Sequence, residues 1–92
     1  MKLKVIIIDD HTLFREGLQR LLVRHDIDVT ASVSNGEDGY KAIEKNTPDI
    51  VLLDLRMPNI SGIEVLKNIR QTRKNLPVVM LTTSDDEKDL ID

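Results

Sequence analysis

Residues 50–58 read Ile-Val-Leu-Leu-Asp-Leu-Arg-Met-Pro, and this stretch decides the fold. Its first four residues are all apolar, which is typical of a strand that is buried on both faces. Asp54 follows directly, and Pro58 indicates that the chain then leaves the strand. Open α/β sheets place their chemistry at the carboxyl ends of their strands, and packing alone does not require an acid here. Asp54 is therefore the first candidate functional residue.

Three other segments favour strands. Leu3–Ile8 is apolar and β-branched apart from Lys4, and Val78–Thr83 is another largely apolar run after Pro77. Asp28–Ser34 alternates polar with apolar residues, which is typical of an edge strand half exposed to water. The sequence thus predicts four strands.

A helix is predicted after the first strand, with Thr12 as its N-cap and His25–Asp26 at its end. Gly17 in this helix predicts a close approach to the sheet, because glycine otherwise costs about 1 kcal/mol against alanine. The apolar side chains at helical spacing predict a buried stripe, which consists of Phe14, Leu18, Leu21 and Leu22.

Two more complete helices are predicted. One spans Glu37–Lys45, and the other has Ser61 as N-cap, Glu64 in the capping-box position and a basic end at Arg70–Lys74. A further helix is predicted to start at Ser84–Asp86. Regular alternation of strands and helices predicts an α/β fold, a doubly wound parallel sheet with right-handed crossovers and helices on both faces.

Composition excludes several classes of protein. The 92 residues suffice for one domain, and the net charge of −3 is spread along the chain, which argues against a general polyanion-binding surface. The chain has no cysteine, so neither a disulfide nor a thiolate metal site is possible. No apolar run approaches the roughly 20 residues of a membrane span, and the N-terminus lacks a signal-peptide core. We expect a cytoplasmic domain without membrane contact.

Acidic residues follow two of the predicted strands. Asp9 and Asp10 come after the first strand and Asp54 after the third, so a parallel sheet would bring them to one edge. Each acid alone is commonly a turn or helix cap, but together they predict a site. Carboxylates that repel one another are tolerated when a hard divalent cation binds, and Mg²⁺ suits this set. Thr82 and Thr83 add hydroxyl groups to the same edge, although such a pair is more often explained by strand propensity.

His11 is expected to be a loop residue at the start of a helix and not a metal ligand or a base. The basic group at residues 70–74 is likewise expected to be a solvated helix end that the helix dipole favours.

Here the residues resemble a known family, the receiver domain of two-component response regulators. The similar parts are Ile6–His11, Asp54 with Pro58 and Gly62 after it, and Leu81-Thr82. The Asp-Asp-His start and residues 13–17, Leu-Phe-Arg-Glu-Gly, resemble the subfamily whose members carry a LuxR-type DNA-binding output domain. The resemblance covers essentially the whole chain and implies a flavodoxin/CheY-like fold with strand order 2-1-3-4.

The resemblance also implies a mechanism. Asp54 would accept a phosphoryl group from a sensor histidine kinase, giving an aspartyl phosphate. Asp9, Asp10 and Asp54 would hold Mg²⁺ together with the backbone carbonyl of Arg56, and Asp9 would act partly through water. Thr82 would hydrogen-bond a phosphoryl oxygen and so bias a two-state surface. Such a domain is a signalling module and not a turnover enzyme.

The sequence departs from the family at its C-terminal end. Family members have a fifth strand and helix, and a lysine beside the phosphoryl group, which residues 1–92 do not supply. We expect a receiver domain over 1–92 that is incomplete, with the DNA-binding output domain absent. Phosphorylation would then be weak, and the exposed edge of the fourth strand would favour a homodimer or a swapped oligomer.

One alternative stays open, and two others fit the residues poorly. The chain could be an interaction fragment whose phosphorylation is impaired. A haloacid-dehalogenase-type phosphohydrolase also uses an Asp at a strand end, but it requires a second Asp where this chain has Arg56. A dinucleotide-binding half-domain requires Gly-x-Gly-x-x-Gly after the first strand, and this chain has Asp-Asp-His-Thr-Leu-Phe.

Overall fold

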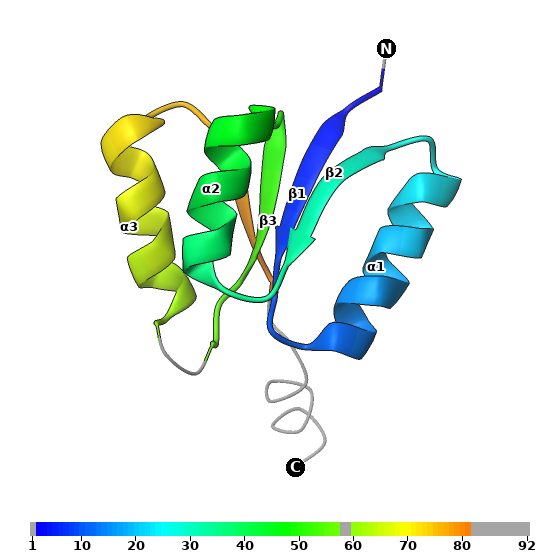
Figure 1. Ribbon diagram of the computed structural model, residues 1–92, viewed down its shortest axis with the longest axis horizontal. Coiled ribbons are helices and arrows are strands. Elements are labelled where there is room, and N and C mark those ends of the chain that lie inside the picture. Colours follow the sequence, from blue (N-terminus) through cyan, green and yellow to red (C-terminus); the bar gives the residue numbers. More distant parts are fainter. Residues whose placement is uncertain (1, 58–59, 82–92) are drawn as a thin grey trace.

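The structure is a computed structural model that describes residues 2–57 and 60–81 of the 92-residue chain. Across these residues, strands and helices alternate in the predicted order: β1 (Lys4–Ile8), α1 (Thr12–Arg24), β2 (Asp28–Val33), α2 (Gly36–Asn46), β3 (Ile50–Asp54), α3 (Gly62–Thr72) and β4 (Val78–Leu81). The strands form one parallel sheet in the order β2-β1-β3-β4, which confirms the predicted fold class and strand order (Figure 1). The helix predicted from Ser84 lies outside the described residues.

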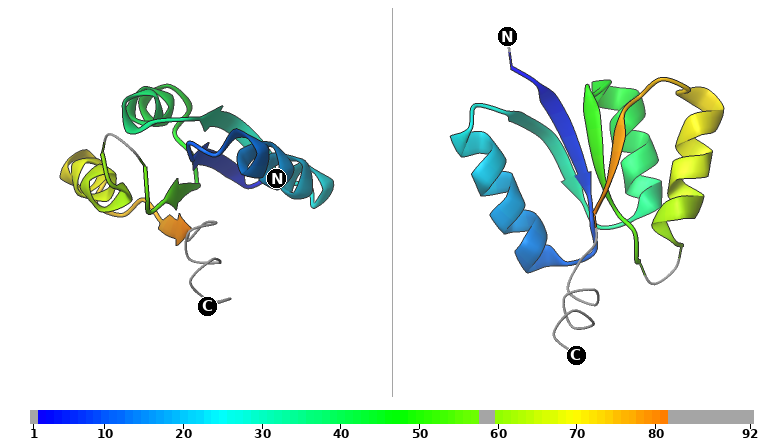
Figure 2. Two further views of the ribbon diagram at one scale, coloured as in Figure 1. Left: turned by 90° about the horizontal axis from the view of Figure 1, so that it is seen from below. Right: turned by 180° about the vertical axis from the view of Figure 1, so that it is seen from behind.

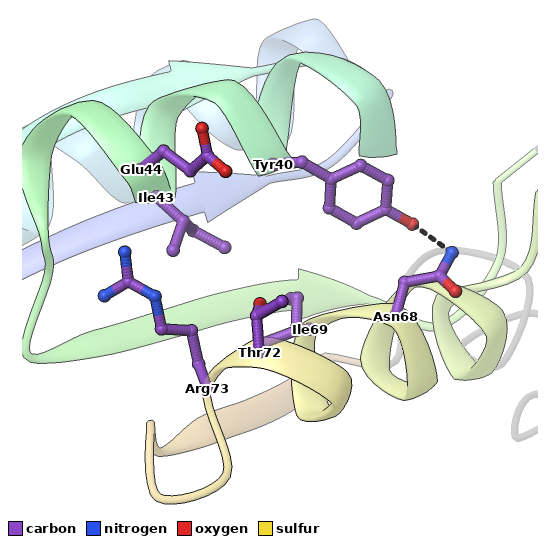
Figure 3. Close-up of a pocket in the computed structure, with 7 residues that line it drawn as sticks. All are labelled: Tyr40, Ile43, Glu44, Asn68, Ile69, Thr72 and Arg73. Carbon is purple, nitrogen blue, oxygen red and sulfur yellow. Dashed lines mark hydrogen bonds between the residues drawn. The ribbon is translucent and has the colours of Figure 1, made fainter.

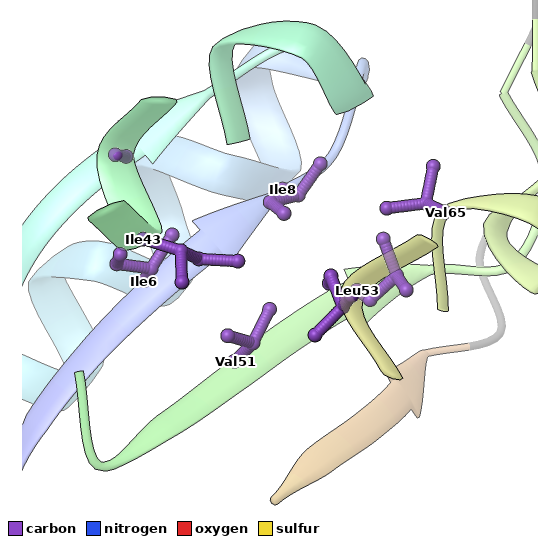
Figure 4. Packing of buried hydrophobic residues seen from close by; sticks show 8 residues of the cluster. Ile6, Ile8, Ile43, Val51, Leu53 and Val65 are labelled. Atoms are coloured by element: carbon purple, nitrogen blue, oxygen red, sulfur yellow. The ribbon is translucent and has the colours of Figure 1, made fainter. Parts of the chain in front are cut away.

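The hydrophobic core lies between the sheet and the helices α2 and α3, which cover one face while α1 lies on the other (Figures 1 and 2). Alternation along the strands turns every second side chain towards α2 and α3. Apolar burial of this kind stabilises the fold by about 1.5–3 kcal/mol for each large side chain. Figure 4 shows the cluster, whose buried members are Ile6, Ile8, Ala42, Ile43, Val51, Leu53, Val65 and Ile69.

Helix α1 covers its face of the sheet only in part. Val5 and Ile7 of β1 are buried, whereas Val79 of β4 is 47% exposed. No residue of α1 is buried, and Phe14 and Leu21 are 44% and 50% exposed, so the predicted buried stripe is wrong for these two. The reason is that α1 packs chiefly along β2, at one side of the sheet.

The predicted close approach does not explain Gly17. A Cβ atom built at this position meets no other atom within 4 Å, apart from those of its own helix turn and chain neighbours. The prediction of a close approach between α1 and the sheet is therefore wrong, and glycine is not required here by packing.

The helix starts agree with the sequence at α3 but not at α1. Ser61 is the N-cap of α3, as predicted, and its Oγ accepts a hydrogen bond from the backbone N–H of Glu64 at 3.2 Å. At α1 the N-cap is His11, which makes no side-chain capping hydrogen bond, and Thr12 is already helical. The prediction of Thr12 as N-cap is wrong because the preceding loop is held instead by the carboxylate of Asp9, which accepts from the backbone N–H of His11 at 2.8 Å.

Candidate metal centre

The acidic residues at the carboxyl ends of β1 and β3 meet at one edge of the sheet. Strands β1 and β3 are neighbours, and Ile8 pairs with Leu53 in their register. The next residues along the two strands, Asp9 and Asp54, are therefore brought side by side. Together with Asp10 and His11, they offer ligand atoms that all lie within 4.8 Å of one another.

The side chains of this cluster differ in their exposure to solvent. The side chains of Asp9 and Asp54 are 0% exposed, while those of Asp10 and His11 are 26% and 38% exposed. Asp9 is held from two sides, since its carboxylate accepts from the backbone of His11 and its carbonyl accepts from Nη1 of Arg15 at 2.6 Å. Asp9 is thus held in place, while the more exposed side chains of Asp10 and His11 leave the cluster open to solvent on one side.

The ionisation of Asp54 is strongly perturbed. Its pKa is raised from the ordinary 3.8 to about 6, chiefly by burial and in addition by the charges of Asp9 and Asp10. The backbone N–H of Arg56, which donates to Oδ1 of Asp54 at 3.1 Å, acts in the opposite direction and lowers this pKa. The buried, crowded carboxylate is therefore costly in the absence of a cation.

The loop after β3 is held close to the strand by Gly62. The backbone N–H of Gly62 donates to the carbonyl of Leu55 at 2.9 Å. A Cβ atom at Gly62 would collide with the carbonyl oxygen of Asp54 and would lie 2.8 Å from Cα of Leu55. Only glycine allows α3 to begin this near to the candidate site.

The contacts described above do not test the predicted roles of two site groups, the carbonyl of Arg56 and the hydroxyl of Thr82. Arg56 lies in the loop after β3 and contributes its N–H to Asp54, while a ligand role for its carbonyl stays a prediction. Thr82 lies outside the described residues, and so does Pro58.

Sequence reasoning missed two residues that contact the cluster. Nδ1 of His11 lies 3.1 Å from Oδ1 of Asp9, 3.2 Å from Oδ1 of Asp10 and 3.5 Å from Oδ2 of Asp54. The hydrogen bond with Asp9 is the main reason that the pKa of His11 is raised. Arg15 is the other missed residue, and its spacing of six from Asp9 gives no recognisable signal in the sequence. The imidazole directly after an acid pair is visible in the sequence, but the direction of its ring is set by the loop and has no local signal.

The residues present fit a hard divalent cation. Asp9 is completely buried, yet its Oδ2 has no hydrogen-bond partner in the described part of the chain. A buried carboxylate oxygen without a partner is costly, and a cation would supply the missing interaction. Three carboxylates in one place are the oxygen ligands that Mg²⁺ prefers. This geometry supports a metal site at the edge of the sheet.

A second hollow lies between α2 and α3, away from the carboxylates. It has a volume of about 200 Å³, which is below the range of about 300–1,000 Å³ typical of ligand pockets. Nδ2 of Asn68 donates to the hydroxyl of Tyr40 across it at 2.7 Å (Figure 3). We interpret this hollow as a packing defect between α2 and α3, two helices that are joined by this hydrogen bond.

Comparison with known proteins agrees with this architecture. Residues 5–92 match the response regulator receiver domain family. The chain is 38% identical over 87 residues to the transcriptional regulatory protein DegU of Brevibacillus brevis, covering 94% of this chain and 37% of that protein. It is 36% identical over 88 residues to the nitrate/nitrite response regulator protein NarL of Escherichia coli K12, covering 95% and 41%. The chain therefore spans about two fifths of the length of these relatives.

Solved structures of similar proteins share the fold. A LuxR-family two-component response regulator from Aurantimonas sp. SI85-9A1 superposes with a TM-score of 0.85 and 32% identity, covering 91% of this chain and 61% of that one. A LuxR-family DNA-binding response regulator from Staphylococcus aureus gives a TM-score of 0.80 and 34% identity, covering 97% and 78%. Among the described residues, no helix is long and apolar enough to cross a membrane.

Proposed function

The chain belongs to the response regulator receiver domain family, and from this premise we propose that Asp54 accepts a phosphoryl group in a two-component signalling pathway. The observation that carries the proposal is the position of its carboxylate, which is buried at the end of β3 against Asp9 and Asp10. In the reaction, a carboxylate oxygen of Asp54 forms a bond to phosphorus while the bond from phosphorus to the donor breaks. The donor is a phosphohistidine of a sensor kinase, which regains its imidazole.

Mg²⁺ would be held by Asp9, Asp10 and Asp54, with the backbone carbonyl of Arg56 as a further ligand. When bound, the ion neutralises negative charge on the phosphoryl oxygens. Oδ2 of Asp9 has no hydrogen-bond partner among the described residues, which supports this proposal. The pKa of Asp54, which burial and the neighbouring carboxylates raise to about 6, supports it as well, because a bound cation would favour the ionised form. Asp54 must be ionised to attack, and bound positive charge favours that form at neutral pH.

The surrounding residues orient the acceptor. The N–H of Arg56 fixes one oxygen of Asp54 at 3.1 Å, and Gly62 lets the loop pack against the end of β3. We further propose that Thr82, which follows β4, donates its hydroxyl to a phosphoryl oxygen and so couples phosphorylation to the segment beyond it. β4 adjoins β3, and Leu81 is paired with Asp54 in their register, which supports this role for the next residue.

The domain acts as a signalling module and not as a turnover enzyme, because the product of the reaction is the phosphorylated domain itself. One relative is named a transcriptional regulatory protein, and a similar solved structure is named a DNA-binding response regulator. We therefore propose that a longer parent protein carries a DNA-binding output domain and works in the cytoplasm. DNA contact would then come from that output domain.

We also propose that copies of this chain associate through β4. In the described residues β4 pairs with β3 on one side only, and Val79 exposes 47% of its surface. An apolar edge strand of this kind recruits a further strand. Light scattering at rising concentration tests this proposal, and a monomer at high concentration would contradict it.

The experiment for the central proposal is incubation with Mg²⁺ and acetyl phosphate, followed by intact-mass measurement. We expect the mass to rise by one phosphoryl group, and this rise to disappear with EDTA or in Asp54→Asn. Asp28→Asn, which changes an exposed acid of β2, is the matched control and should behave as the parent chain. A folded parent chain that gains no mass would favour the alternative of an interaction fragment that is not phosphorylated.

A further inference from the structure

We propose that His11 is a metal ligand, and that it gives this pocket a second mode of loading with d-block divalent cations such as Co²⁺ and Zn²⁺. This inference concerns the same pocket as the proposed function and rests on the pocket being a metal site. It does not rest on phosphorylation of Asp54. It reverses the expectation from the sequence, which assigned His11 to a loop without a metal role.

The distances around Nδ1 of His11 carry the proposal. This nitrogen lies 3.1, 3.2 and 3.5 Å from one oxygen each of Asp9, Asp10 and Asp54. Metal–ligand bonds of about 2.1 Å separate neighbouring ligand atoms by about 3.0 Å in an octahedron and about 3.4 Å in a tetrahedron. The distances from this nitrogen to the three oxygens are therefore those expected between ligand atoms of one ion.

The buried oxygen of Asp9 is an independent indication that a cation belongs here. Asp9 is fully buried, and its Oδ2 has no hydrogen-bond partner among the described residues. The imidazole contacts the other oxygen of the same carboxylate, Oδ1. A hydrogen bond between His11 and Asp9 thus leaves Oδ2 unsatisfied, whereas a cation in the cluster would satisfy it.

The position of the imidazole is set before any metal binds. The backbone N–H of His11 donates to Oδ1 of Asp9 at 2.8 Å, and Arg15 holds the carbonyl of Asp9 at 2.6 Å. The loop that carries the ring is thus tied to the end of β1. The side chain of His11 remains 38% exposed, which leaves a path for an ion from solvent.

The ligand set predicts which cations bind more tightly when His11 is a ligand. Mg²⁺ prefers oxygen and keeps its waters, so the carboxylates serve it without the imidazole. Imidazole nitrogen is a strong ligand for Zn²⁺, Co²⁺ and Ni²⁺, and it binds in its neutral form. The pocket would therefore hold Mg²⁺ through oxygen alone and a d-block cation through three oxygens and Nδ1.

The test compares metal affinities of the untagged chain with those of His11→Gln and His25→Gln. His25 is the other histidine, exposed at the end of α1, and its variant is the matched control. Co²⁺ is titrated by its visible absorption, Zn²⁺ by competition with Co²⁺, and Mg²⁺ by calorimetry. We expect His11→Gln to lower the affinity for Co²⁺ and Zn²⁺ about ten-fold more than that for Mg²⁺, and His25→Gln to change neither.

A spectroscopic readout separates ligation from a structural role of His11. In two-bond ¹H–¹⁵N spectra of the parent chain, Zn²⁺ should shift the Nδ1 resonance of His11 strongly and that of His25 little. Equal losses of affinity for all three cations in His11→Gln, or an Nδ1 resonance that Zn²⁺ leaves in place, would overturn the proposal. The proposed function fails by a different result, the absence of Mg²⁺-dependent phosphorylation, so the two failures are distinguishable.

Discussion

Replacing Asp54 by Asn should stabilise the metal-free protein at pH 7.5 and leave its free energy of unfolding nearly unchanged at pH 4. The reason is the pKa of Asp54, which burial raises from 3.8 to about 6. Between these values the folded state binds more protons than the unfolded state, so stability falls as the pH rises from about 4 to about 6. An amide at this position does not ionise and avoids that loss.

The size of the effect follows from the pKa difference. One pKa unit corresponds to about 1.4 kcal/mol, so a rise from 3.8 to about 6 corresponds to about 3 kcal/mol at pH 7.5. His11 changes stability in the same direction, because its pKa is also raised and its stabilising charge is lost at higher pH. His11 is present in both proteins, so the difference between them reports chiefly on Asp54.

The assay is urea unfolding of both proteins, followed by circular dichroism at pH 4, 6 and 7.5 with EDTA present. Asp28→Asn, an exposed acid in β2, serves as control and should show no such trend. Adding Mg²⁺ at pH 7.5 should stabilise the parent chain and reduce the advantage of Asp54→Asn. The reasoning would be refuted if Asp54→Asn were less stable than the parent chain at pH 7.5. It would also be refuted if the substitution changed the free energy of unfolding by the same amount at all three pH values.

Substitutions at three further positions test the packing and capping of the helices. Gly62→Ala should lower the free energy of unfolding by about 1–3 kcal/mol and weaken Mg²⁺ binding, because the new Cβ collides with the backbone of Asp54; unchanged urea midpoints would contradict this. Gly17→Ala should raise stability by about 0.5–1 kcal/mol in the same assay, since space is open there and the helix favours alanine; a destabilised protein would show that glycine is needed. Ser61→Ala should cost about 1 kcal/mol through loss of the cap on Glu64, and Ser61→Asn should restore it.

The sequence predicted the order of strands and helices because apolar patterning and caps are local signals. The run before Asp54 and the capping box at Ser61 each determine their element without reference to the rest of the chain. The meeting of Asp9 with Asp54 was also predictable, since carboxyl ends of parallel strands share one edge.

The errors arise where the outcome depends on tertiary placement. Helical spacing identified the apolar side of α1, but it could not show that the sheet beneath covers Phe14 and Leu21 only in part. Thr12 has the right chemistry for an N-cap, but the carboxylate of Asp9 holds the preceding loop and moves the cap to His11. The direction of the His11 ring towards three acids is equally a property of that loop, and no spacing rule predicts it.

The central claim is that Asp54 is the phosphoacceptor, and borohydride trapping tests it most directly. After incubation with acetyl phosphate and Mg²⁺, borohydride reduces an aspartyl phosphate to homoserine, which peptide mass spectrometry locates in the sequence. We predict homoserine at position 54 alone, in an amount that depends on Mg²⁺. Homoserine at position 9 or 10, or none in a folded chain that binds Mg²⁺, would contradict the account.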